Sequence, residues 1–98
     1  MHTAEIIRKL RDHQIELRDA GVLHLALFGS VARDEAGEAS DIDLMADFDD
    51  AKRLSLIGVI GIKHRLEDIL GGEVDLAQTK NLRPSVRERA LREAVVAF

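Results

Sequence analysis

The sequence predicts an α/β domain of the α+β type, in which a small three-stranded sheet is flanked by helices. Three short apolar runs with the length of strands cover residues 22–28, 41–47 and 73–77. Stretches with helical spacing lie before, between and after them, so the expected order is helix, strand, helix, strand, helix, strand, helix. We expect the run at 41–47 to lie in the middle of the sheet. The chain has 98 residues, enough for one modest core, and residues 1–98 are expected to form a single domain without a second one for an acceptor.

Composition and charge exclude several classes of protein. Hydrophobic residues make up 46% of the chain and charged residues 33%, which is typical of a folded protein and not of a disordered one. The formal net charge of −4 argues against a nucleic-acid surface that extends over the whole chain. There is no cysteine, so disulfides and thiolate catalysis are excluded, and no run suits a signal peptide or a membrane span. We therefore expect a cytoplasmic protein that does not contact a membrane.

The first predicted helix begins with Thr3 as its N-cap and stops at Gly21. Apolar residues recur along it at helical spacing, namely Ile6, Ile7, Leu10 and Leu17. His13 lies on this helix and His24 interrupts the first strand. Neither has a second histidine at metal-binding spacing, so both are expected to be structural.

A second helix is expected to end at Gly71-Gly72. Its apolar stripe is formed by Leu56, Val59, Ile60, Leu66, Ile69 and Leu70. Gly58 and Gly61 weaken the first half, which predicts fraying or a late start. Asp49 or Asp50, which follow the second strand, are expected to favour the helix start.

The last helix is expected to begin at Pro84, which suits the first helical position. Its predicted apolar face consists of Val86, Ala90, Leu91, Ala94 and Val95. The arginines on its other faces are typical of a solvated surface, with ion pairs Glu88–Arg92 and Arg89–Glu93.

The end of the first strand predicts a phosphate-binding corner. The strand stops at Gly29-Ser30, and residues 30–35 are expected to form the first turns of a helix. Because glycine has no Cβ, backbone and ligand can approach closely, and the unpaired N–H groups at a helix start point toward an anion. The Ser30 hydroxyl adds one more donor.

The second strand carries two acids at alternating positions, Asp41 and Asp43. Residues two apart lie on one face of a strand, whereas Ile42, Leu44 and Ala46 are expected to face a core. Neighbouring unpaired carboxylates raise each other's pKa unless they share a cation. Ligands that are all oxygen favour Mg²⁺ or Mn²⁺, with water and substrate phosphates completing the shell. If the strand of Asp75 pairs beside this one, its carboxylate joins the cluster and supports a second metal ion.

Each of these signals has an ordinary explanation when it is taken alone. A Gly-Ser corner is common, and two alternating acids more often mark a solvated strand edge or the start of a turn. Here the two signals occur together beside apolar runs. Acids on an otherwise hydrophobic strand cost stability unless they have a use, so the combination favours phosphoryl or nucleotidyl transfer.

With these residues in place, the sequence resembles a known superfamily. Gly29-Ser30, ten residues and Asp41-x-Asp43 resemble the GSx10DxD signature of the polymerase-β-like nucleotidyltransferases. The short length is similar to that of the minimal nucleotidyltransferases (MNT), the antitoxins of MNT–HEPN toxin–antitoxin pairs. Residues 66–96 are also similar to the family's tail, with its LG, VDL, LRP and REAV segments in order.

The resemblance implies a nucleotidyltransferase fold with a mixed sheet and an enzyme that transfers AMP from ATP with the help of two Mg²⁺ or Mn²⁺ ions. The implied catalytic and metal-binding residues are Asp41, Asp43 and Asp75, and the implied phosphate-binding residues are Gly29 and Ser30. Arg33 would add a phosphate contact, although a structural ion pair with Asp34 or Glu38 explains it equally well. The acceptor would be a hydroxyl on a helical HEPN-type toxin, which the transfer neutralises.

Other functions stay open at this point. An RNA end could be the acceptor, although the charge does not indicate it. The chain could be a non-catalytic antitoxin that neutralises its partner by complex formation, but three repelling carboxylates argue against a pure binding module. A transferase for a small molecule would lack a domain to hold its acceptor.

Overall fold

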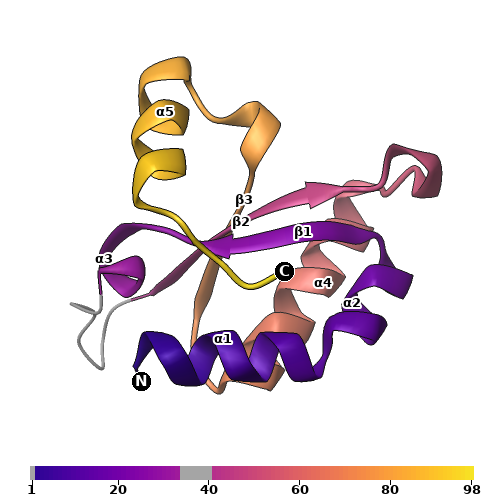
Figure 1. Cartoon of the computed structure of the whole chain (residues 1–98). Helices are drawn as coiled ribbons and strands as arrows, with labels where there is room; N and C mark the ends of the chain where they lie inside the picture. The colour runs from indigo at the N-terminus through magenta and orange to yellow at the C-terminus, as the bar shows by residue number, and fades with distance from the viewer. Residues whose placement is uncertain (1, 34–40) are drawn as a thin grey trace.

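The computed structural model describes residues 2–33 and 41–98, which fold around a mixed β-sheet (Figure 1). The helices are α1 (Thr3–Asp12), α2 (Gln14–Ala20), α3 (Gly29–Ala32), α4 (Leu56–Leu70) and α5 (Pro84–Glu93). The strands are β1 (Val22–Leu27), β2 (Ile42–Phe48), β3 (Val74–Gln78) and β4 (Val95–Val96). Two short 3₁₀ helices follow β2 and β3, namely η1 (Asp50–Lys52) and η2 (Thr79–Asn81). In the part of the chain that is described, no helix has the length and apolar character needed to cross a membrane.

The sheet has the strand order β3-β2-β1-β4. β2 lies in the centre, parallel to β3 and antiparallel to β1, and β4 pairs antiparallel with the other edge of β1. The predicted three strands, their mixed directions and the central place of the Asp43 strand are therefore confirmed. The fourth strand is a correction. Val95 pairs with Leu27 because α5 ends at Glu93 and Ala94 is extended, where the apolar spacing predicted more helix.

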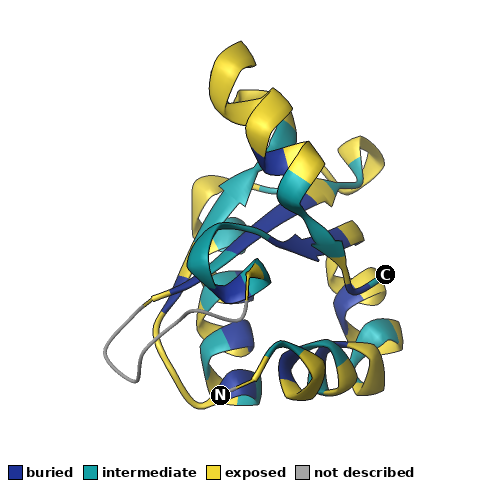
Figure 2. Cartoon of the chain, turned by 60° about the vertical axis from the view of Figure 1, so that its left-hand side comes forward, coloured by how far each residue is buried: buried dark blue, intermediate teal, exposed yellow. Residues whose placement is uncertain are grey.

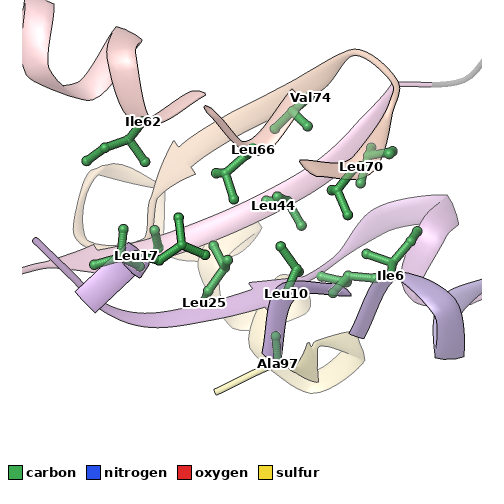
Figure 3. Close-up of a cluster of buried hydrophobic side chains, with 14 of the residues drawn as sticks. Ile6, Leu10, Leu17, Leu25, Leu44, Ile62, Leu66, Leu70, Val74 and Ala97 are labelled. Atoms are coloured by element: carbon green, nitrogen blue, oxygen red, sulfur yellow. The ribbon is translucent and has the colours of Figure 1, made fainter. Parts of the chain in front are cut away.

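Three helices cover one face of the sheet and build the main core (Figure 3). Leu10 of α1, Leu17 of α2 and Leu66 of α4 are at most 1% exposed and pack with Leu25 and Leu44 of the sheet. Each such aliphatic side chain contributes about 1.5–3 kcal/mol to folding when it is removed from water. The prediction that the even-numbered residues of β2 face a core is confirmed.

Within the described residues, α5 is the helix that covers the opposite face of the sheet (Figure 1). Its buried cluster is small and consists of Ala26, Met45 and Ala90. α5 begins at Pro84 as predicted, but of its predicted apolar face only Ala90 is buried, and Val86 and Leu91 are 46% and 53% exposed. Figure 2 shows how much of this helix remains open to solvent.

The first predicted helix is divided in two. His13 separates α1 from α2, and α2 ends at Gly21 with a φ of +115°, as predicted. The predicted N-cap is wrong, because the cap position is His2 and Thr3 lies inside the helix. The Thr3 hydroxyl instead donates to the carbonyl of Val31 at 2.6 Å.

The helix after β2 starts where the sequence did not predict it. α4 begins at Leu56, ahead of Gly58 and Gly61, so the expected late start is wrong. Its N-cap is Ser55, whose hydroxyl accepts from the Gly58 N–H at 3.1 Å. Asp49 is a cap as well, but of η1, where it accepts from the Ala51 N–H at 3.0 Å. The first half of the predicted stripe is not core, since Leu56 is 76% exposed.

Candidate active site

Gly29 forms the corner between β1 and α3, and two features require a glycine there. Its φ of +68° lies in the left-handed region, which other residues rarely adopt. A Cβ on this residue would lie 2.5 Å from the Oδ2 atom of Asp43, too close for a real contact. The missing side chain therefore lets the Asp43 carboxylate lie directly against the Gly29-Ser30 corner.

The helix after this corner contributes less than the sequence predicted. α3 has four residues with Arg33 as its C-cap, while Asp34 and Glu35, at the end of the predicted helix, lie outside the described residues. One turn of helix sums very few peptide dipoles, so it has little macrodipole to attract an anion. The attraction of this corner for an anion therefore has to come from individual N–H groups, from the Ser30 hydroxyl and from the nearby Arg33 side chain.

β2 places Asp43 on the face of the sheet opposite the main core. The residues on either side, Ile42 and Leu44, are 8% and 0% exposed, and Asp43 itself is half-buried. In the parallel ladder Asp75 of β3 is the direct partner of Asp43, so both carboxylates leave the sheet on the same side. Asp41 lies just before β2 and is exposed, as is Asp75.

The three acids interact through their charges. Burial raises the pKa of Asp43, and the negative charges of Asp75 and Asp41 raise that pKa further, whereas Arg33 lowers it. Such mutual repulsion is relieved when a cation binds between carboxylates. The electrostatics of the site therefore favour a positively charged ligand beside Asp43.

The donor set fits a hard divalent cation, because Mg²⁺ typically takes one or two carboxylates and completes its shell with water and phosphate oxygens. Across residues 2–33 and 41–98, no group of three or more Asp, Glu or His side chains is close enough together to hold a metal ion by itself. Asp43 with one neighbouring acid would therefore share an ion with the phosphates of a substrate. The three-acid metal site stays a prediction.

A cleft of about 660 Å³ opens beside Asp43. One wall contains Phe28, Gly29, Ser30, Arg33 and Asp43, and α5 supplies the other wall with Ser85, Val86, Glu88, Arg89, Ala90, Arg92 and Glu93. This volume lies in the usual range for a site that holds a small ligand. The structure thus brings four predicted site residues to one cleft, whereas Asp41 and Asp75 are outside its lining and reach it only as neighbours of Asp43.

Arg33 joins the two walls of the cleft. Its Nη1 donates to Oε2 of Glu93 at 3.0 Å, and the predicted alternatives Asp34 and Glu38 lie outside the described residues. The two ion pairs predicted on α5 are confirmed, with Arg92–Glu88 at 3.2 Å and Arg89–Glu93 at 3.9 Å.

The α5 wall itself was missed by sequence reasoning. Its arginines and glutamates were visible in the sequence, but spacing along a helix does not say which face of a sheet the helix covers. The sequence did contain one signal, the many charged residues around Ala90, the buried position of α5. A helix with so few buried residues covers little core, so its charged faces are available to line a cleft.

A family model for the nucleotidyltransferase domain matches residues 6–97. The chain belongs to this family. Among related proteins, the protein adenylyltransferase MntA of Thermococcus cleftensis is 39% identical to this nucleotidyltransferase over 92 residues, which are 93% of this chain and 91% of that protein. MJ0435 of Methanocaldococcus jannaschii, provisionally named a protein adenylyltransferase, is 41% identical over 75 residues, or 76% of this chain and 78% of that protein.

Solved structures have the same fold. One that is provisionally described as a minimal nucleotidyltransferase matches with a TM-score of 0.80 and 38% identity, and covers 97% of this chain and 95% of its own. A complex of tri-AMPylated HEPN toxin of Shewanella oneidensis with its MNT antitoxin matches with a TM-score of 0.64 and 20% identity, over 94% of this chain and 71% of that one. The resemblance to minimal nucleotidyltransferases, and with it the class of enzyme, is confirmed.

Proposed function

We propose that this nucleotidyltransferase transfers AMP from ATP to a hydroxyl group of a partner protein, in a reaction that needs a divalent cation. The observation that carries the proposal is the contact of Asp43 with Gly29. An acid suited to hold a cation lies against a corner suited to hold phosphates, beside a cleft of about 660 Å³. The names of the related protein adenylyltransferases support AMP as the transferred group.

Asp41 and Asp43 would hold Mg²⁺ or Mn²⁺, and Asp75 would share the ion nearest the acceptor. A bound cation neutralises negative charge on the triphosphate. The N–H groups at Gly29-Ser30 and the Ser30 hydroxyl orient the β and γ phosphates, and Arg33 adds a contact from the same wall of the cleft.

Asp75 is exposed on the same face as Asp43, so it can accept the proton of an incoming hydroxyl. The hydroxyl oxygen forms a bond to the α-phosphorus while the bond from that phosphorus to the bridging oxygen of the β-phosphate breaks. Pyrophosphate leaves in line with the attack, and the N–H donors of the corner stabilise the charge that develops on it. The products are an AMP ester on the partner and pyrophosphate.

The acceptor has to be held largely from outside the chain. Among the described residues that line the cleft, Phe28 is the only aromatic one, and α5 is the only helix on this face. The solved complexes of MNT antitoxins with HEPN toxins support a helical protein of the HEPN type as the partner. AMP transfer would neutralise that toxin.

Incubation with labelled ATP, Mg²⁺ and the product of the neighbouring gene tests the proposal. We expect label on the neighbour's product with the wild-type chain, and none after chelation or with Asp43→Asn. Transfer at the same rate without divalent metal, or by Asp43→Asn, would remove the cation from the mechanism.

A second candidate is a non-catalytic antitoxin. It is favoured by one observation, that within the described residues the acids do not converge as a ready metal-binding group. The same experiment separates the two functions: a stable complex that neutralises the toxin without any label would support the binding module. Label on an RNA end in place of the protein would identify the other acceptor.

A further inference from the structure

Glu93 of α5 is a carboxylate that lies between two arginines inside the candidate active-site cleft. Its Oε2 accepts from Nη1 of Arg33 at 3.0 Å, and its Oε1 lies 3.9 Å from Nε of Arg89. Arg33 follows α3 on one wall and Arg89 belongs to the other wall, and all three side chains line the cleft. One carboxylate therefore joins cations from both walls.

This arrangement is that of an anion hydrogen-bonded to one guanidinium group, Arg33, with the charge of a second, Arg89, 3.9 Å away. Carboxylate and phosphate oxygens use the same N–H donors of arginine, so either anion can take this place. The two arginines share the cleft with Gly29 and Ser30, so a polyphosphate bound at that corner has both guanidinium groups within the same cavity.

The Glu93 contacts are suited to being exchanged. The side chains of Arg33 and Glu93 are 40% and 36% exposed, and that of Arg89 is 71% exposed. Ion pairs with this degree of exposure contribute little to stability, because solvent screens them. A ligand with several negative charges can therefore replace the single charge of Glu93 without unfolding the site.

We propose that Glu93 is an internal stand-in for the phosphates of the nucleotide. It occupies Arg33 and Arg89 in the free chain, and the polyphosphate of the bound nucleotide displaces it, so that both arginines become phosphate-binding residues. Only the identity of the ligand rests on the proposed function. Glu93 then weakens nucleotide binding, because its contacts are lost and its negative charge stays near the phosphates.

Glu88 is a matched control for Glu93. It lies on the same helix, lines the same cleft and pairs with an arginine, Arg92, at 3.2 Å. Both members of that pair belong to α5, so the pair does not join the two walls. Replacing Glu88 changes the charge of the cleft by the same amount as replacing Glu93, but it leaves Arg33 and Arg89 with their carboxylate.

Calorimetric titration with inorganic tripolyphosphate and Mg²⁺ tests the proposal on the intact chain. We expect Glu93→Gln to bind about fivefold more tightly than wild type, and Glu88→Gln to gain less than about twofold. Equal gains would show a general charge effect and would overturn the proposal. No gain for Glu93→Gln, or no binding by either wild type or Glu93→Gln, would overturn it as well.

Arg33→Gln and the double variant Arg33→Gln/Glu93→Gln complete the test. If Glu93 acts by occupying Arg33, the gain from Glu93→Gln becomes smaller when Arg33 is absent. A gain of the same size in both backgrounds would contradict the stand-in role. Because tripolyphosphate has no adenosine and no acceptor is added, these results stand whether or not AMP transfer is observed.

Discussion

The two faces of the sheet differ in what their residues contribute. The face under α1, α2 and α4 is filled by buried aliphatic side chains, whereas the face under α5 has a small cluster and carries the charged residues of the cleft. Two neighbours on β2 represent the difference: Leu44 is 0% exposed, and Asp43 is a half-buried acid with a raised pKa. Because side chains alternate along a strand, β2 directs Leu44 into the core and Asp43 into the candidate active site.

The largest expected effect belongs to Asp43→Asn. AMP transfer should fall by at least about 10³-fold, because the residue suited to hold the cation is lost. Thermal stability without metal should hold or rise. The pKa of Asp43 is raised in the fold, so its ionised form costs free energy at neutral pH, and this cost is absent below the unfolded pKa.

Labelled transfer and a thermal melt with chelator measure both effects on the same sample. A large fall in melting temperature would mean that Asp43 supports the fold. It would contradict the assignment of stability to one face of the sheet and of the candidate site to the other. Asp75→Asn should also reduce transfer. A wild-type rate in that variant would remove Asp75 from the mechanism.

Leu44→Ala, one residue away, should have its main effect on stability, where Asp43→Asn has its main effect on AMP transfer. Truncation of a side chain that is 0% exposed should lower the free energy of unfolding by about 2–5 kcal/mol, because a cavity is left in the core. Denaturant titration measures the loss. A change below about 1 kcal/mol would contradict the importance assigned to this face.

Gly29→Ala tests whether AMP transfer and stability both depend on a glycine at the corner beside Asp43. The new Cβ would meet Oδ2 of Asp43 at 2.5 Å, so the carboxylate has to move and transfer should fall by about 10-fold or more. The positive φ should add about 1–3 kcal/mol of strain.

Gly71→Ala is the matched control for this strain. Its φ of +72° is almost the same, but a Cβ there would meet nothing within 4 Å. It should lose stability and keep transfer per folded molecule, as measured by combining denaturant titration with the labelling assay. Equal loss of transfer in both variants would show that the Asp43 contact is not the cause.

The smallest expected effect is on the pH dependence of stability, and it comes from an exposed ion pair between α2 and α4. Glu16 of α2 accepts hydrogen bonds from Arg65 of α4, and these bonds, together with one from His13, lower its pKa to about 2. The stability that this pair supplies is therefore present above the ordinary pKa of 4.5 and is lost as pH falls toward about 2.

Melting curves of wild type and Glu16→Gln should accordingly differ at neutral pH and converge in acid. Because the pair is exposed, added salt should reduce the difference. A gap that widens as pH falls would have the wrong sign for this ion pair.

Local patterns predicted the residues whose role depends on local geometry. Gly29 and the alternation of Asp43 with Leu44 could be found because a corner and a strand face are determined by a few consecutive residues. Val95 could not, since its apolar side chain suits both a helix and the strand that pairs with Leu27, and only the tertiary fold selects between them. The same holds for Glu93, which meets Arg33 only because α5 covers that side of the sheet.

The hydrogen bond from the Thr3 hydroxyl to the Val31 carbonyl reaches from the first turn of α1 to the residue after Ser30. The same carbonyl accepts from the backbone N–H of Arg33, the C-cap of α3, so the Thr3 hydroxyl is a second donor that ties this short helix to α1. The bond restricts the conformations that the corner can adopt before a phosphate arrives, so less entropy is lost when one binds. A change at Thr3, far along the chain from every acid of the site, would therefore weaken nucleotide binding because the corner would be less preorganised.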